Sequence, residues 1–136
     1  MRLAGWEERL AALVAAADTQ PYMLGSFDCF RLACAAVAAC TGRDVWPLYA
    51  GRYRTRAESI RMIRSVDPDL RAAIGKVFAL PQIPVKQAGR GDIYLFEDRL
   101  PHLGVGLGPF VGVLAEGGLG LLRIDDPGIK AAWSVA

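Results

Sequence analysis

The chain has 136 residues, of which 53% are hydrophobic and 22% charged, and its formal net charge at pH 7 is +2. This length suits a single domain over residues 1–136, and the composition excludes an intrinsically disordered chain. The charge is too small to indicate nucleic acid or an anionic membrane as a partner, and no apolar stretch is long enough for membrane insertion.

Apolar residues at helical spacing predict two helices near the start of the chain. The first covers Arg2–Ala17. It carries acidic residues at its centre, whereas a secretory signal peptide has a basic start followed by an unbroken apolar core. The second follows a turn at Gly25, with Asp28 suited to cap its first N–H groups and Gly42 placed as a C-cap. We therefore expect a buried second helix in a protein that carries no export signal of its own.

A connector then leads to two further predicted helices. The third covers Thr55–Arg64, where Thr55 and Glu58 form a capping-box pattern. Arginines are frequent in and just before this helix, and we interpret them as its solvated side rather than as a polyanion site. A fourth helix is predicted to begin at Asp67, and the segment Pro81–Gly91 is predicted to be a loop because it contains prolines and glycines.

Beyond this loop, short apolar or alternating runs separated by glycines predict a small antiparallel sheet. The expected strands are Asp92–Glu97, Leu103–Leu107, Phe110–Ala115 and Leu119–Arg123. Asp126–Pro127 is predicted to start a last short helical turn, and Ala131–Val135 is predicted to pack Trp133 back against the domain. Helices followed by an antiparallel sheet give an α+β fold class.

Three cysteines, Cys29, Cys34 and Cys40, lie on the second predicted helix. At about 100° per residue, Cys29 and Cys40 share a face about three turns apart while Cys34 points away, so we expect neither a metal site nor a disulfide. Free thiols fit synthesis in a reducing cytoplasm. Cys29 lies on the first turn, where free N–H groups and the helix dipole favour a nucleophilic thiolate; a buried core cysteine is the alternative.

His102 is the only histidine of the chain and directly precedes a predicted strand. Histidine exchanges protons near neutral pH and is the base that a cysteine nucleophile needs. A cysteine at a helix start with a histidine at the edge of a following sheet is the arrangement of papain-like thiol enzymes. The alternative is a surface histidine beside a core cysteine.

Three segments resemble the motifs of NlpC-type papain-like cell-wall peptidases. The segment PYMLGSFDCFRLACAAV (Pro21–Val37) resembles their nucleophile segment, Gly91–Ile93 their Gly-Asp-hydrophobic strand start, and His102–Gly108 their histidine strand. The chain is more similar still to short proteins of phage and prophage tail-gene clusters that are distant relatives of these peptidases, because Trp6, Gly118–Leu122 and the pair Ala132–Trp133 also match.

This resemblance implies that Cys29 is the nucleophile, that His102 is the general base and that Tyr22 lines the site. Asp28 lies beside the nucleophile, although its simpler interpretation is the helix cap. The residue that orients the histidine in the family has no clear match, and Glu116 is the nearest polar candidate. No metal or cofactor is implied.

The resemblance also implies a papain-like (NlpC-type) fold, with the residues at about 44–85 as a helical insertion. The first function expected is a phage tail-associated cysteine peptidase that cleaves peptidoglycan stem peptides during cell-wall passage. The alternative is a catalytically silent structural component of a tail tip or baseplate, with other tail proteins as partners. In both cases the protein is made in the bacterial cytoplasm and incorporated in the virion tail. A cytoplasmic amidase or thioesterase of the same fold is a third, weaker expectation.

Overall fold

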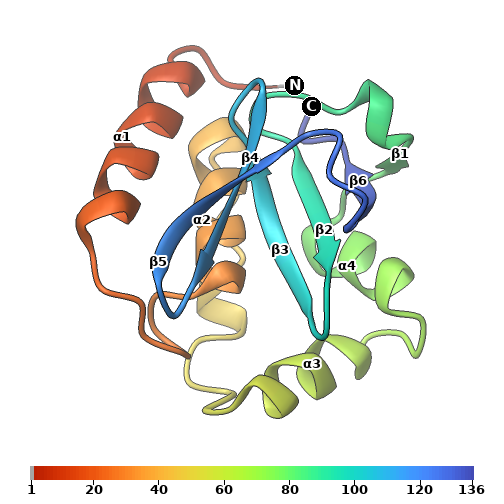
Figure 1. The fold of residues 1–136 in the computed structure, drawn as a ribbon. Helices are drawn as coiled ribbons and strands as arrows, with labels where there is room; N and C mark the ends of the chain where they lie inside the picture. The colour runs from red at the N-terminus through yellow and green to blue at the C-terminus, as the bar shows by residue number, and fades with distance from the viewer. Residues whose placement is uncertain (1) are drawn as a thin grey trace.

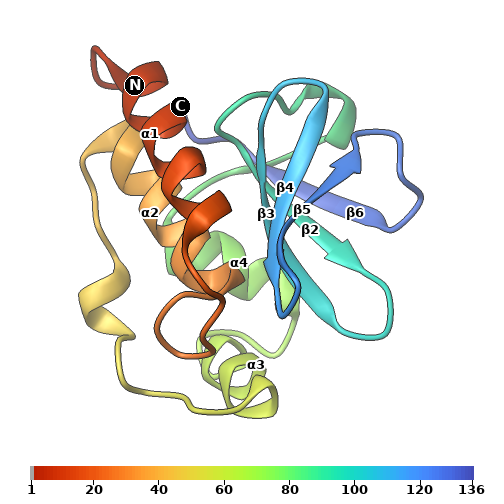
Figure 2. The ribbon, with the colours of Figure 1, turned by 60° about the vertical axis from the view of Figure 1, so that its left-hand side comes forward.

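The computed structural model describes residues 2–136, in which four α-helices accompany one six-stranded antiparallel sheet. The α+β class predicted from the sequence is confirmed. Figure 1 shows the order of the elements, and Figure 2 shows that the α-helices gather on one side of the sheet. None of the helices in residues 2–136 has the length and apolar character needed to cross a lipid bilayer.

Helix α1 (Trp6–Thr19) begins later than predicted. Gly5 precedes it with φ 79°, a left-handed conformation that cannot continue a right-handed helix, so the prediction of a helix from Arg2 was wrong at its start. Its buried residues, Leu10 and Ala17, belong to the main core, and the helix packs against its successor.

Helix α2 (Cys29–Thr41) lies behind the sheet and beside α1 in Figure 1, and it packs against both. Asp28 caps it by accepting a hydrogen bond from the N–H of Arg31, and Gly42 ends it with φ 79°, so both predicted caps are confirmed. Most of its side chains are buried, namely Phe30, Leu32, Ala33, Cys34, Ala36, Val37 and Cys40. Because α2 packs against α1 and β3, its first residue is held close to the sheet.

The next part of the chain contains the 3₁₀ turn η1 (Trp46–Leu48), helix α3 (Arg56–Arg64) and helix α4 (Leu70–Phe78). Thr55 caps α3 by accepting from the N–H of Glu58, as the capping-box pattern predicts. Helix α4 begins later than predicted, because Asp69 rather than Asp67 is its N-cap.

The segment predicted to be a loop, Pro81–Gly91, contains strand β1 (Gln82–Ile83) and the 3₁₀ turn η2 (Val85–Gln87), so that prediction was wrong in part. In β1, Gln82 pairs with Trp133 near the far end of the chain. This short strand depends on a distant partner, which local composition does not reveal.

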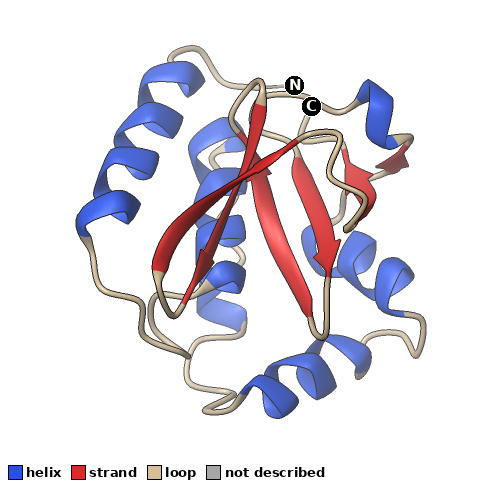
Figure 3. Ribbon diagram, viewed as in Figure 1, coloured by secondary structure: helices blue, strands red, loops and turns tan. Residues whose placement is uncertain are grey.

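The remaining strands are β2 (Ile93–Glu97), β3 (Pro101–Gly106), β4 (Phe110–Ala115), β5 (Gly118–Arg123) and β6 (Ile129–Trp133). The sheet order is β1-β6-β2-β3-β4-β5 (Figure 3). Strand β3 starts earlier than predicted, so His102 lies within it. The helical turn predicted at Asp126–Pro127 was wrong, because a non-helical turn there returns the chain to pair with β2 and bury Trp133.

Candidate active site

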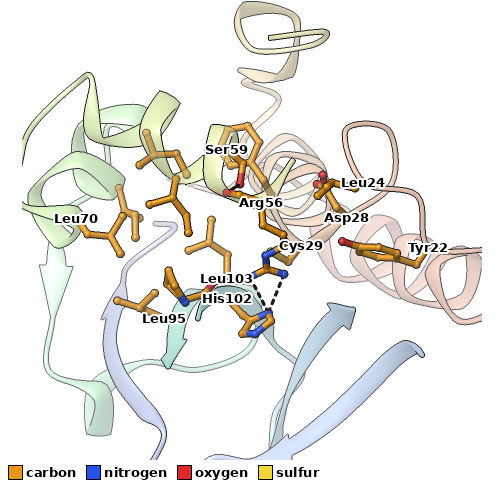
Figure 4. Close-up of a pocket in the computed structure, with 15 residues that line it drawn as sticks. Tyr22, Leu24, Asp28, Cys29, Arg56, Ser59, Leu70, Leu95, His102 and Leu103 are labelled. Carbon is orange, nitrogen blue, oxygen red and sulfur yellow. Dashed lines mark hydrogen bonds between the residues drawn. The ribbon is translucent and has the colours of Figure 1, made fainter. Parts of the chain in front are cut away.

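The start of α2, the start of α3 and the start of β3 meet at a cavity of about 40 Å³ (Figure 4). Its polar lining residues are Tyr22, Asp28, Cys29, Arg56, Ser59 and His102. The other lining side chains are apolar and come mainly from α3, α4 and the sheet. The structure therefore brings four predicted site residues to one place.

Cys29 is the first residue of α2, and its side chain is half-buried at this cavity. Burial raises the pKa of the thiol above its ordinary value, and the charge of Asp28 raises it further. The backbone N–H of Leu103 and the charge of Arg56 oppose the rise without cancelling it. The pKa at this helix start is therefore raised rather than lowered, because the loss of hydration outweighs the stabilising N–H groups.

His102 is the second residue of β3, and its side chain is 13% exposed. Its Nδ1 lies 3.5 Å from both terminal nitrogens of Arg56, and its Nε2 lies 3.5 Å from Oδ1 of Asp98. Burial lowers the pKa of the imidazole from its ordinary value of 6.5, Arg56 lowers it further, and Asp98 opposes both. The ring is thus neutral at pH 7, and the carboxylate beside Nε2 favours the tautomer that leaves a lone pair on Nδ1.

Arg56 is the first residue of α3, and its half-buried side chain reaches into the cavity. One terminal nitrogen donates a hydrogen bond of 2.9 Å to the carbonyl oxygen of Pro101. Within residues 2–136 no carboxylate lies within 4.0 Å of the guanidinium. The interpretation of the arginines of this region as solvated was wrong for Arg56. Thr55, the capping residue before it, predicts where α3 begins. It does not predict that the first turn of α3 faces the cavity.

Asp28 has a structural role in the turn before α2. Its Oδ1 accepts from the N–H of Arg31 at 2.9 Å, and its Oδ2 accepts from the N–H of Gly25 at 2.8 Å and from the hydroxyl of Tyr53 at 2.6 Å. The residue is 2% exposed, and both of its oxygens are engaged. Asp28 therefore shapes the turn that presents the cysteine, which confirms its interpretation as a cap.

The thiol of Cys29 and the ring of His102 face the same cavity, but no hydrogen bond joins them in the described part of the chain. In Figure 4 the guanidinium of Arg56 lies between these two side chains. Tyr22 flanks the group; burial raises the pKa of its phenol, and Arg56 opposes that rise. The resting site thus holds a neutral thiol, a neutral imidazole and one cation.

A family described as a domain of unknown function, DUF6950, matches residues 1–135. The chain belongs to the DUF6950 family. The match includes the helices, the sheet and all the residues that line the cavity of this DUF6950 domain. A search of the curated proteins found no match.

In this DUF6950 domain the carboxylate nearest His102 is that of Asp98, which sequence reasoning missed. Asp98 lies in the turn between β2 and β3, and its place four residues before the histidine was the available signal, since a tight hairpin brings such positions together. Glu116, the candidate from the sequence, is exposed between β4 and β5 and does not line the cavity.

Proposed function

We propose that this DUF6950 protein is a cysteine hydrolase of the NlpC papain-like type, with Cys29 as nucleophile and His102 as general base. The observation that carries the proposal is their shared cavity, which a helix start and a sheet strand reach from distant parts of the sequence. The packing of α2 against β3 supports a papain-like arrangement, with the residues at about 44–85 as a helical insertion.

The reaction starts from the neutral pair. As the sulfur of Cys29 attacks the carbonyl carbon, the thiol proton passes to Nδ1 of His102 and the C=O electron pair moves to oxygen. The imidazolium then protonates the leaving nitrogen as the C–N bond breaks. Water, deprotonated by the same imidazole, hydrolyses the remaining thioester. The backbone N–H of Cys29 has no acceptor within its helix and is suited to stabilise the oxyanion.

The proposed substrate is an amide bond of a peptidoglycan stem peptide, and the proposed setting is a phage tail during cell-wall passage. Both rest on the resemblance of the segments around Cys29 and His102 to NlpC-type peptidases and their phage tail relatives. Arg56 lines this cavity beside His102, so we expect its side chain to move when a substrate enters.

The test compares wild type with Cys29→Ala in release of stem-peptide fragments from purified peptidoglycan. Cys34→Ala is the matched control, since Cys34 is a free thiol of the same helix that is buried away from the cavity. Fragments should appear with wild type and with the control and be absent with Cys29→Ala. Equal release by all three proteins would remove the hydrolase proposal.

A silent structural component of a tail tip or baseplate is the second candidate. This candidate is favoured by the contact of Arg56 with Nδ1 of His102. In a catalytic pair, the thiol of Cys29 would instead be hydrogen-bonded to that nitrogen. If the role is structural, His102→Ala leaves particle assembly and infectivity unchanged, while deletion of the whole protein abolishes assembly. Loss of infectivity with intact His102→Ala particles contradicts the structural role.

A further inference from the structure

The guanidinium of Arg56 is a half-buried cation with hydrogen-bonding capacity to spare. Among residues 2–136, its short hydrogen bond is the 2.9 Å contact to the carbonyl oxygen of Pro101, and the phenol of Tyr22 also lies beside it. The contacts to Nδ1 of His102, at 3.5 Å, are long for hydrogen bonds. A guanidinium with free N–H groups beside a thiol is well suited to bind an anion.

The acidic residues near the cavity do not satisfy this charge. Both oxygens of Asp28 are already engaged by two backbone N–H groups and by Tyr53. Asp98 faces the opposite nitrogen of the His102 ring. Within residues 2–136 no carboxylate pairs with Arg56, so charge complementarity favours an anion that arrives with the substrate.

We propose that Arg56 is a specificity-determining residue that binds a carboxylate of the substrate adjacent to the bond attacked by Cys29, an inference that rests on the proposed hydrolase function. A planar carboxylate matches the guanidinium fork and accepts two parallel N–H···O bonds. Cys29 and Arg56 line the same cavity, so one ligand can contact both side chains.

This pairing also explains how the catalytic pair forms. A carboxylate is a stronger partner for the guanidinium than a neutral imidazole at 3.5 Å, so binding draws Arg56 away from Nδ1 of His102. The freed lone pair then accepts the proton of the Cys29 thiol. A substrate without the carboxylate leaves Arg56 in its resting place and the pair unformed.

The test is selective alkylation of Cys29 by two reagents that differ only in charge, iodoacetate and iodoacetamide. In each reaction the thiolate sulfur forms an S–C bond and displaces iodide, so no hydrolytic turnover is needed. At about pH 8 the His102 ring is neutral, and Arg56 is then the cation at the sulfur. We expect the iodoacetate-to-iodoacetamide rate ratio at Cys29, followed by peptide mass spectrometry, to exceed that of glutathione about fivefold.

Three variants assign the preference to Arg56. Arg56→Gln should reduce the ratio to that of glutathione, and Arg56→Lys should retain part of the preference. Arg64→Gln, at an exposed arginine of the same helix that does not line the cavity, should leave the ratio unchanged. The inference is overturned if wild type shows no preference over glutathione, or if Arg64→Gln lowers the ratio as much as Arg56→Gln does.

The wild-type comparison with glutathione requires no variant to fold. Alkylation also separates this inference from the hydrolase proposal. A preserved iodoacetate preference with no peptidoglycan cleavage leaves the carboxylate site standing and removes the hydrolase. Cleavage that depends on Cys29, without any iodoacetate preference, leaves the hydrolase standing and removes the role of Arg56.

Discussion

Oδ1 of Asp98 lies 3.5 Å from Nε2 of His102, across the turn that joins β2 to β3. The backbone N–H of Leu100 donates to the same carboxylate and lowers its pKa, and the side chain is 58% exposed, so Asp98 is ionised at neutral pH. An ionised carboxylate at Nε2 fixes the tautomer whose Nδ1 accepts a proton. Asp98 therefore serves as a positioning residue for the proposed base.

Replacement of Asp98 by Asn should lower kcat/KM for peptidoglycan fragments about tenfold, equivalent to ~1.4 kcal/mol in the activation barrier. The loss is moderate because the carboxylate is exposed and distant by hydrogen-bond standards. Glu116→Gln is the control and should have wild-type activity, since Glu116 lies in a different turn. A larger loss with Glu116→Gln than with Asp98→Asn contradicts this assignment.

His102 is the only histidine, so its C2 proton gives a single titrating signal in ¹H NMR spectra. Because burial and Arg56 lower the pKa, the midpoint should lie below 6.5 in wild type. Arg56→Gln removes a nearby positive charge and should move the midpoint upward, whereas Asp98→Asn removes a negative charge and should move it downward. An unchanged midpoint in both variants shows that the ring faces neither charge, and shifts in the opposite directions contradict the contacts to Arg56 and Asp98.

Helix α2 and strand β4 were predictable because their determinants are local. Asp28 and Gly42 mark the ends of the helix through the side chain and backbone conformation of single residues. Phe110–Ala115 is an apolar run between glycines, and the strand has the predicted bounds. The order of these elements also predicted that Cys29 and His102 would come to one place, and both line the same cavity.

The contacts that set the chemistry of the site are not local. Arg56 belongs to an arginine-rich stretch, and only the packing of α3 over the cavity distinguishes it from its solvated neighbours. The thiol pKa of Cys29 also depends on non-local contacts. The helix start by itself favours the thiolate, but burial of the side chain in the folded domain raises the pKa. Sequence periodicity carries no information about which side chains enclose the sulfur.

The raised pKa of Cys29 predicts the pH dependence of its alkylation. Alkylation by iodoacetamide should rise towards alkaline pH without a plateau in the neutral range, because the resting pair is neutral rather than a thiolate–imidazolium pair. Arg56→Gln should move the rise to still higher pH, since Arg56 lowers the thiol pKa. The rates are compared with those of glutathione, and half-maximal reactivity below about pH 7 in wild type contradicts this protonation state.

Asp92 is hydrogen-bonded to residues near both ends of the chain, so its replacement should destabilise the fold. Its Oδ1 accepts from the N–H of Val135 at 2.8 Å and from Arg2 at 3.0 Å, and its Oδ2 accepts from the N–H of Gly89 at 2.8 Å. An asparagine places a donor against one of these donors, so Asp92→Asn should lower the free energy of unfolding by about 3 kcal/mol.

Urea denaturation measures the effect, with Asp125→Asn as its control. Asp125 pairs with Arg123 on the surface, where the two side chains are 70% and 79% exposed, so the control should change stability by less than about 0.5 kcal/mol. Similar urea midpoints for Asp92→Asn and wild type would show that the hydrogen bonds of Asp92 contribute little to the free energy of unfolding.

Glycine is required at position 106, the last residue of β3, because the backbone of Gly89 lies very close to it. Its N–H donates to the carbonyl of Asp92 at 2.9 Å, and a Cβ added at this position lies 2.1 Å from the carbonyl oxygen of Gly89. Because neither backbone segment can yield without breaking the turn that holds Asp92, Gly106→Ala should destabilise the domain by about 3 kcal/mol or more. Gly117→Ala, with nothing within 4 Å of its added Cβ, should melt within a few degrees of wild type. Circular dichroism melting distinguishes the two, and equal melting temperatures contradict the close packing of β3 against this turn.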